Sequence, residues 1–121
     1  MKEKTLKALR GAVCCVNIKE EIAQRTVELY DKLLSANNVT EADILSLFFS
    51  ITSDIDALNP AGALRQSGRA GDAAIMVFQE AAVQGSLPGT IRVLIHAYMA
   101  AENPVQHIYF GGAEQLRPDW S

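Results

Sequence analysis

The sequence has little that would mark a membrane, disulfide-rich or zinc-binding protein. Its two cysteines, Cys14 and Cys15, are adjacent, which suits neither an intramolecular disulfide nor the spaced ligand pairs of a zinc site, so we expect two reduced strand residues. No apolar run approaches the roughly 18 residues of a membrane span, and the opening MKEKTLKALRG lacks the apolar stretch of a signal peptide. We therefore expect a cytoplasmic protein that does not act at a membrane.

Lysine is missing from most of the chain. All five lysines lie within the first 32 residues, and the basic residues beyond them are Arg65, Arg69, Arg92 and Arg117, set against nine carboxylates. The net charge of −3 provides no footprint for nucleic-acid binding. Arginine without lysine suits the fixed, forked recognition of a carboxylate or phosphate, although chance composition accounts for four arginines equally well.

Five segments have the composition of β-strands. The 121 residues are enough for one domain with one hydrophobic core, so we expect a single domain over 1–121 that contains all of these strands. Runs of apolar and β-branched residues predict strands at 7–16, 44–54, 73–83, 91–99 and 107–110. The run at 44–54 is almost continuously apolar, which predicts burial on both faces of a sheet. Gly11, in the first strand, permits close approach of another part of the backbone.

A long amphipathic helix follows the first strand. We expect Asn17 to be its N-cap, with Glu20 completing a capping box. Its apolar stripe belongs to the core, and the helix is expected to end near residues 37–38. Thr40 followed by Asp43 predicts a short helical turn before the next strand.

A second, shorter helix is predicted to open at Asn59-Pro60, with the proline in its first turn, and to end around Gly68. The order β-α-β-α-β-β, with the further strand at 107–110, predicts an α+β sheet whose helices pack on one face. The polar tail, about 115–121, is expected to be mobile. Because so small a chain has apolar strand edges to hide, we expect an oligomer.

Three charged side chains interrupt short apolar strands: Arg10, Glu80 and Arg92. Unpaired buried charges are costly, so these residues either face solvent, pair with one another as a structural feature, or line a pocket rich in arginine with one carboxylate. Such a pocket suits an anionic ligand that also carries a hydroxyl group, and Tyr109 would supply a further donor. Spacing alone leaves these readings open.

The motifs of most enzyme chemistry are missing. GAVCCVN and GRAGDA match neither a P-loop nor the dinucleotide fingerprint. No serine lies in a nucleophile elbow, and His96 and His107 lack the paired spacing of a metal site. We expect no metal, and we expect His107 to be a strand residue beside the core rather than a ligand. Hydrolysis, phosphoryl transfer and redox chemistry therefore have no visible machinery.

Several stretches together resemble the AroH-type chorismate mutases over nearly the whole chain. They are RGA near the start, SITSDIDALNPAGALRQSG, then QE, GSLPGTIRVL, HIYF and LRPD. RGA and QE are trivial alone, but the order and spacing of the set are specific, above all GSLPxxIRVL with HxYxxxAxxLRPD downstream of it.

The resemblance implies a ferredoxin-like α+β protomer, assembled as a homotrimeric pseudo-α/β-barrel with an active site at each subunit interface. The implied reaction is the Claisen rearrangement of chorismate to prephenate, a step in phenylalanine and tyrosine biosynthesis, within one molecule and without a cofactor. Catalysis then depends on holding a compact conformer and stabilising the charge that develops as the C–O bond breaks. An acceleration of about 10⁶-fold requires only about 8 kcal/mol.

The resemblance also implies roles for individual residues. Arg92 meets the ether oxygen and a carboxylate, and Glu80 accepts a hydrogen bond from the ring hydroxyl. Arg10 binds a substrate carboxylate with help from Tyr109, and Arg65 reaches in from the neighbouring subunit. The further residues implied to bind substrate are Asn59, Ala61, Val77, Leu116 and Arg117, the last two in the tail that closes over the ligand.

Three positions depart from the pattern of the family: Asn59, Gly62 and Val77 stand where phenylalanine, lysine and cysteine are usual. These changes bear on substrate affinity more than on the reaction, because Arg10 and the other implied catalytic residues remain. Two alternatives stay open. One is a trimer that binds an aromatic-pathway metabolite without catalysis, and the other is a Rid-type imine deaminase, which shares a related barrel but lacks the GSLPxxIRVL and LRPD combination.

Overall fold

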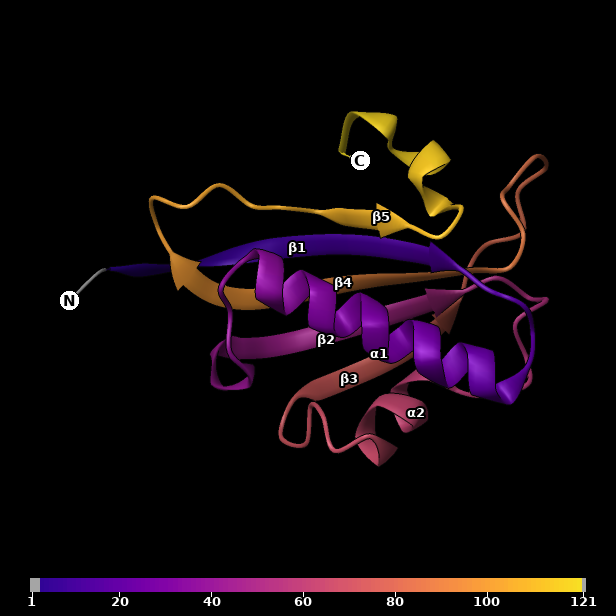
Figure 1. Cartoon of the computed structure of the whole chain (residues 1–121), viewed down its shortest axis with the longest axis horizontal. Coiled ribbons are helices and arrows are strands. Elements are labelled where there is room, and N and C mark those ends of the chain that lie inside the picture. The colour runs from indigo at the N-terminus through magenta and orange to yellow at the C-terminus, as the bar shows by residue number, and fades with distance from the viewer. Residues whose placement is uncertain (1–2, 121) are drawn as a thin grey trace.

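The strands form one five-stranded sheet. The computed structural model describes residues 3–120, and Ser121, the last residue of the tail predicted to be mobile, lies outside them. The strands, coloured along the chain in Figure 1, are β1 (Lys4–Cys14), β2 (Ile44–Ile51), β3 (Ala74–Gln79), β4 (Thr90–Ala100) and β5 (Ile108–Phe110). Each corresponds to a predicted strand, and the predicted α+β architecture is confirmed.

The spatial order of the strands is β3-β2-β4-β1-β5. The long β4 lies at the centre and pairs antiparallel with both β1 and β2. The two edge strands, β3 and β5, are short and pair parallel with β2 and β1 respectively. The sheet therefore brings the N-terminal strand between two strands from the last third of the chain (Figure 1).

The third strand ends earlier than predicted. β3 stops at Gln79, so Glu80 lies just beyond the strand and not inside it. The Glu80 N–H donates to the carbonyl of Ile51 at 2.7 Å, which holds this residue beside the end of β2. Residues 81–86, predicted to continue the strand, are instead an exposed loop in which even Val83 buries little of its surface.

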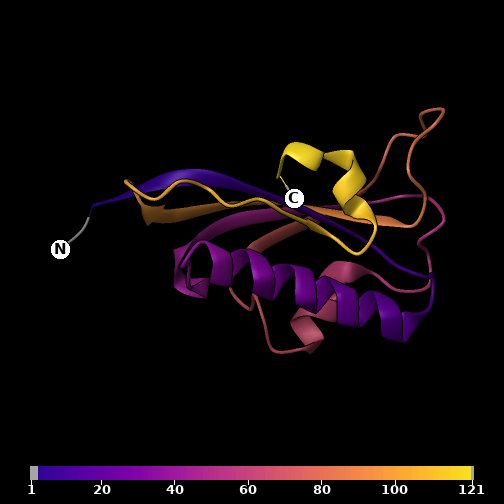
Figure 2. The same ribbon diagram turned by 45° about the horizontal axis from the view of Figure 1, so that its top comes forward.

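Both helices pack on the same face of the sheet, as predicted. They are α1 (Lys19–Ala36) and α2 (Pro60–Gln66), and the turned view in Figure 2 shows both below the sheet. Alternate residues of β2 and β4 meet them, including Leu47, Phe49 and Ile95, which are at most 1% exposed. In β1, Gly11 allows α1 and β5 to approach closely, because a Cβ at this position would lie 2.9 Å from Leu29 Cδ1 and from the Ile108 carbonyl oxygen.

The predicted N-cap of the first helix is wrong. The residue before α1 is Ile18, and no side chain caps the helix there. Asn17 instead bonds the loop after β2: its Nδ2 donates to Asp56 Oδ1 at 2.7 Å, and its Oδ1 accepts from the N–H groups of Asp56 and Ala57. The Asn17 side chain thus bonds a loop that is distant in sequence and leaves the N–H groups of the first turn of α1 without a side-chain cap. The local sequence does not indicate which of the two it will bond.

The other predicted caps are confirmed. Thr40 and Asp43 form a capping box around a 3₁₀ turn at Glu41–Asp43. Asn59 caps α2, because its Oδ1 accepts from Ala61 N at 2.9 Å and Gly62 N at 3.4 Å, and Pro60 occupies the first turn. Gly68 follows the helix with φ +87°, the left-handed conformation that ends many helices.

Among residues 3–120, the opposite face of the sheet carries no α-helix, and we call it the open face. It presents alternate residues of all five strands, among them Arg10, Phe48, Phe78, Arg92 and Tyr109. The prediction that 44–54 is buried on both faces is therefore wrong for the single chain, since Ser46, Phe48 and Ser50 are only half-buried. Apolar side chains are exposed here: Leu6 (46%), Met76 (55%), Phe78 (48%) and Tyr98 (44%).

The tail folds back over one edge of the open face. It forms two 3₁₀ turns, Ala113–Leu116 and Pro118–Trp120, seen in yellow at the top of Figure 1. Ala113 is fully buried against Ala12 and Tyr109, with Leu116 packed beside them. Within residues 3–120, no helix is long and apolar enough to cross a membrane.

Asn37 fastens the end of α1 to the segment before β5. Its Nδ2 donates to the carbonyls of Leu33 (2.8 Å) and Gln106 (2.9 Å), its Oδ1 accepts from Gln106 N (2.8 Å), and it is 3% exposed. We expect Asn37→Ala to lower the free energy of unfolding by about 2–3 kcal/mol, because the Gln106 groups lose their partners. Urea denaturation measures this, with the exposed Gln24→Ala of the same helix as a neutral control; equal midpoints for the two would contradict it.

Thr26 is fully buried in α1, and its hydroxyl has no hydrogen-bond partner within the described residues. Valine has the same shape without the polar group, so Thr26→Val removes a desolvated hydroxyl at little steric cost. We expect the melting temperature to be unchanged or raised by a stability gain of up to about 1 kcal/mol. Thr26→Ser, which keeps the hydroxyl and opens a methyl-sized gap, is expected to lower it, and a destabilised valine variant would show that the hydroxyl has a partner.

Candidate active site

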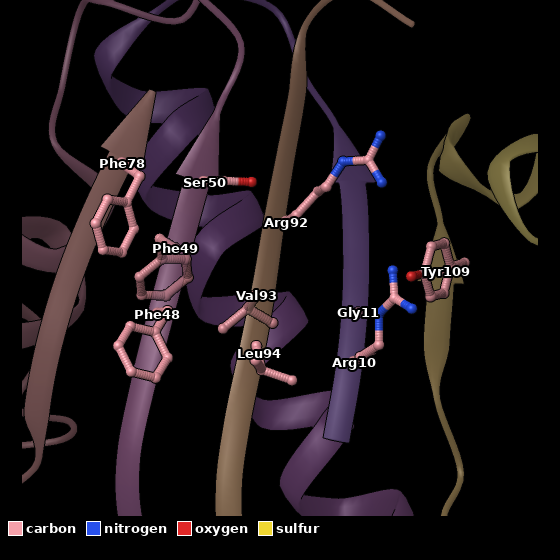
Figure 3. A pocket seen from close by; sticks show the side chains of 10 residues that line it. All are labelled: Arg10, Gly11, Phe48, Phe49, Ser50, Phe78, Arg92, Val93, Leu94 and Tyr109. Atoms are coloured by element: carbon pink, nitrogen blue, oxygen red, sulfur yellow. The ribbon is translucent and has the colours of Figure 1, made fainter. Parts of the chain in front are cut away.

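A hollow of about 410 Å³ lies on the open face, between β2, β3 and β4 on one side and β1 and β5 on the other. Aromatic and aliphatic side chains form one wall and arginines the other, as Figure 3 shows. The lining residues are Arg10, Gly11, Phe48, Phe49, Ser50, Phe78, Arg92, Val93, Leu94 and Tyr109.

Arg92 and Glu80 form an ion pair at one end of the hollow. Arg92 Nε donates to Glu80 Oε1 at 2.7 Å, and the side chains are 32% and 17% exposed. Both residues are positioned by the end of β2. Arg92 of β4 lies opposite Ser50 in the β2–β4 pairing, and the carbonyl of the next residue, Ile51, accepts the Glu80 N–H. The bond to Glu80 uses Nε, and Figure 3 shows the terminal nitrogens of Arg92 directed toward β1, away from the phenylalanine side chains.

Arg10 and Tyr109 lie together at the other side of the hollow. Register explains their proximity, because Tyr109 of β5 pairs with Ala12 of β1, and Arg10 lies two residues before Ala12 on the same face of the sheet. Tyr109 is 5% exposed, and its hydroxyl points toward the Arg10 guanidinium (Figure 3). Two cationic groups and a phenol donor therefore surround one apolar floor, an arrangement that suits a ligand with separate anionic groups.

The tail residues of the predicted set lie nearby. Leu116 packs beside Tyr109 at the rim. Arg117 forms a bidentate pair with Asp119, through Nε at 3.0 Å and Nη2 at 2.7 Å. This pairing raises the pKa of Arg117, and it lowers the pKa of Asp119 below its ordinary value.

The remaining predicted residues are not in the hollow of their own chain. Asn59, Ala61 and Arg65 belong to α2, which packs against the covered face of the sheet. Val77 points from β3 into the same covered core. Of the predicted set, the chain thus gathers Arg10, Glu80, Arg92, Tyr109 and the tail residues, and leaves the α2 group on the far side of the sheet.

A hydrogen-bond network at the end of β2 holds the base of the exposed loop 81–88. Asp54 accepts from the Thr52 hydroxyl (2.5 Å) and from Gly89 N (2.9 and 3.2 Å), and Thr52 Oγ1 accepts from Thr90 N (3.0 Å). These bonds, the Thr52 hydroxyl first, lower the pKa of Asp54. The network fixes the end of the loop at Gly89 and Thr90, while the bond from the Glu80 N–H to the Ile51 carbonyl fixes the other end. Thr52 and Asp54 carry no signal in the sequence, because it is the β2–β4 register that brings them to Gly89 and Thr90.

Cys14 and Cys15 carry free thiols; Cys14 is the last residue of β1, whereas Cys15, also predicted to be a strand residue, lies just after the strand. Burial and the charge of Glu21 raise the pKa of Cys15 to about 11, so this thiol stays protonated at neutral pH and is a poor nucleophile. Among residues 3–120, no three histidine, cysteine or acidic side chains gather in a group that could hold a metal ion.

The site agrees with what known proteins show. The family model described as "Chorismate mutase type I" matches residues 6–120, nearly the full length of the chain. The chain belongs to the type I chorismate mutase family. This confirms the resemblance inferred from GSLPGTIRVL, HIYF and LRPD, and it decides against the Rid-type alternative.

Two curated chorismate mutases of the AroH type are similar over most of their length. The one from Bacillus subtilis (strain 168) is 30% identical over 118 residues, which is 96% of this chain and 93% of that protein. The one from Thermus thermophilus is 35% identical over 119 residues, or 94% and 95% of the two chains. The solved structure of a chorismate mutase from Clostridium thermocellum matches with a TM-score of 0.82 at 34% identity, covering 90% of this chain and 98% of the other.

Proposed function

We propose that this chorismate mutase family member rearranges chorismate to prephenate in the hollow on the open face. The observation that carries the proposal is the Arg92–Glu80 pair beside Arg10 and Tyr109 on a largely apolar floor. Chorismate is a dicarboxylate with a ring hydroxyl and an ether oxygen, so it needs cationic groups, one acceptor and apolar walls. The hollow offers each of these.

The proposed chemistry takes place within the substrate. The ether C–O bond breaks as a new C–C bond forms, so no proton or leaving group passes to the protein. Negative charge develops on the ether oxygen as the bond breaks, and a fixed guanidinium lowers the energy of that state more than the energy of the ground state. We assign this role to Arg92, whose bond through Nε to Glu80 holds the guanidinium in place at 2.7 Å.

Glu80 and Arg10 are assigned to orientation. Glu80, which accepts one hydrogen bond from Arg92 through Oε1, has a second carboxylate oxygen to accept the ring hydroxyl. Arg10 with Tyr109 binds a carboxylate, and the aromatic wall formed by Phe48 and Phe78 encloses the ring. Holding the two ends of the substrate close together supplies the proximity term of catalysis.

We further propose that the active unit is a trimer of ferredoxin-like protomers that bury the open face in a barrel-like core. The exposed Leu6, Met76, Phe78 and Tyr98 support this, because so many large apolar side chains on one face mark an interface. A trimer would also bring Arg65 of a neighbour to the hollow, with Asn59 and Ala61 at the start of the same neighbour's α2, and Leu116 and Arg117 would close its rim. We place the enzyme in the cytoplasm.

Arg92→Ala is expected to lower kcat at least about 100-fold, the loss typical of a donor that stabilises transition-state charge, and Arg92→Lys is expected to lower it severely too, because an ammonium lacks the planar fork. The measurement is the ultraviolet decay of chorismate with prephenate identified as product. Arg25→Ala, which removes an arginine paired with Glu28 on α1, is the matched control.

Binding of chorismate without enzyme-dependent decay would contradict the mutase activity and leave the metabolite-binding alternative. In that case Arg92→Lys would lose only a modest part of its affinity. Full activity of Arg92→Ala, with the control unchanged, would remove Arg92 from the mechanism and leave the reaction assigned to other groups.

Met76→Asp is expected to dissociate the trimer, because the substitution places a charge on the open face at a residue that is 55% exposed in the single chain. Sedimentation equilibrium measures the change, from three times the chain mass to the chain mass, and activity is expected to fall with it. Val16→Asp is the control, since Val16 is 61% exposed but lies outside the open face. A wild-type monomer with full activity would contradict the interface site.

A further inference from the structure

His107 accepts a hydrogen bond from the main chain of a residue assigned to substrate binding. The Arg10 N–H donates to His107 Nδ1 at 3.0 Å. The parallel pairing of β1 with β5 runs from Gly11–Ile108 to Val13–Phe110, so this bond lies one residue beyond the paired region. The imidazole therefore replaces the ladder bond at the point where the two strands begin to separate.

The segment that carries His107 is itself held on both sides. Gln106, the residue before it, is bound through both its N–H and its carbonyl to Asn37, at 2.8 and 2.9 Å. Tyr109, two residues after it, is buried against Ala12 and Ala113. Because the residues on either side of His107 are fixed, its ring is fixed too, and the bond from the Arg10 N–H to Nδ1 restrains the backbone of Arg10.

The bond to Arg10 requires one form of the histidine. An acceptor at Nδ1 means a neutral imidazole whose proton is on Nε2. The charged groups that act on the ring are Arg10 from β1 and Arg117 from the tail, both cations, and the segment of His107 itself carries Tyr109 two residues further on, in β5. Burial first, and then these two charges, lower the pKa of His107 below its ordinary value, so the neutral form persists at neutral pH.

We propose that His107 is a positioning residue that holds Arg10 in register to bind the substrate carboxylate. This rests on the proposed function. The ring does not touch the reacting atoms, and it acts through the backbone of Arg10. When the ring gains a second proton, Nδ1–H and the Arg10 N–H are both donors and face one another, so the bond is lost and the start of the β1–β5 pairing is released.

The kinetic test compares two variants at pH 7.5. His107→Asn keeps an acceptor in the same place, because asparagine Oδ1 is attached to Cγ as Nδ1 is in histidine, and its kcat and KM are expected within about twofold of wild type, a difference of about 0.4 kcal/mol. His107→Leu keeps the bulk and loses the acceptor, and we expect its KM for chorismate to rise about tenfold with a smaller change in kcat, the pattern of lost uniform binding.

The pH profile separates positioning from simple packing. In wild type, KM is expected to rise as the pH falls below about 6.5, the ordinary histidine value, since the lowered pKa of His107 keeps the bond intact down to that range. In His107→Asn nothing titrates at this position, so the rise is expected to disappear. The same acid rise in wild type and His107→Asn, or an unchanged KM in His107→Leu, overturns the proposal.

A measurement without substrate keeps the two proposals apart. In ¹⁵N-edited NMR of the ligand-free protein, the Arg10 amide and the His107 ring nitrogens are expected to titrate together, with the proton on Nε2 above the transition. In His107→Asn the Arg10 amide is expected to stay constant. If the wild-type chain turns over no chorismate, the proposed function fails. The His107 variants are then compared by the dissociation constant of chorismate in place of KM. An Arg10 amide that does not follow His107 overturns the positioning role whatever the activity.

Discussion

The antiparallel pairing of the central strand β4 with β1 and β2 is the constraint on which the rest of the structure depends. Because side chains alternate along a strand, the pairing that sends Ile91, Val93 and Ile95 to the helices also sends Arg92 to the open face. A slip of one residue would bury Arg92 and expose the core set. Burial of apolar side chains on the covered face supplies the free energy that holds this register. The same burial therefore determines where Arg92 lies on the open face.

Much of this could be predicted from the sequence, and the exceptions share one cause. Strand composition identified all five strands, and Arg10 and Arg92 stood out as charges inside apolar runs. The cap at Asn17 was wrong, and the network of Thr52 with Asp54 was missed, because both side chains bond to residues tens of positions away. Hydrogen bonds of that range depend on register and topology, which no local pattern encodes.

The division of the predicted site residues between two faces has the same origin. Arg10, Arg92 and Tyr109 converge because three adjacent strands carry them in register, whereas Asn59 and Arg65 are on a helix that the covered core requires for its own packing. A sheet with helices on one face cannot gather both groups around one hollow. The resemblance implies the whole set as a prediction, and the fold of a single chain brings only part of it together.

The position of β1 in the sheet has a consequence for how the protein is made. Within the described residues, β1 pairs with β4 and β5, from Lys4 with Ala100 to Val13 with Phe110, so its partners lie far from it in the sequence. Contacts so distant in sequence carry a high entropic cost before they form and slow the search for the native state. During synthesis, β1 has no strand partner among the described residues until β4 has been made, so its apolar side chains stay without that sheet contact in the meantime.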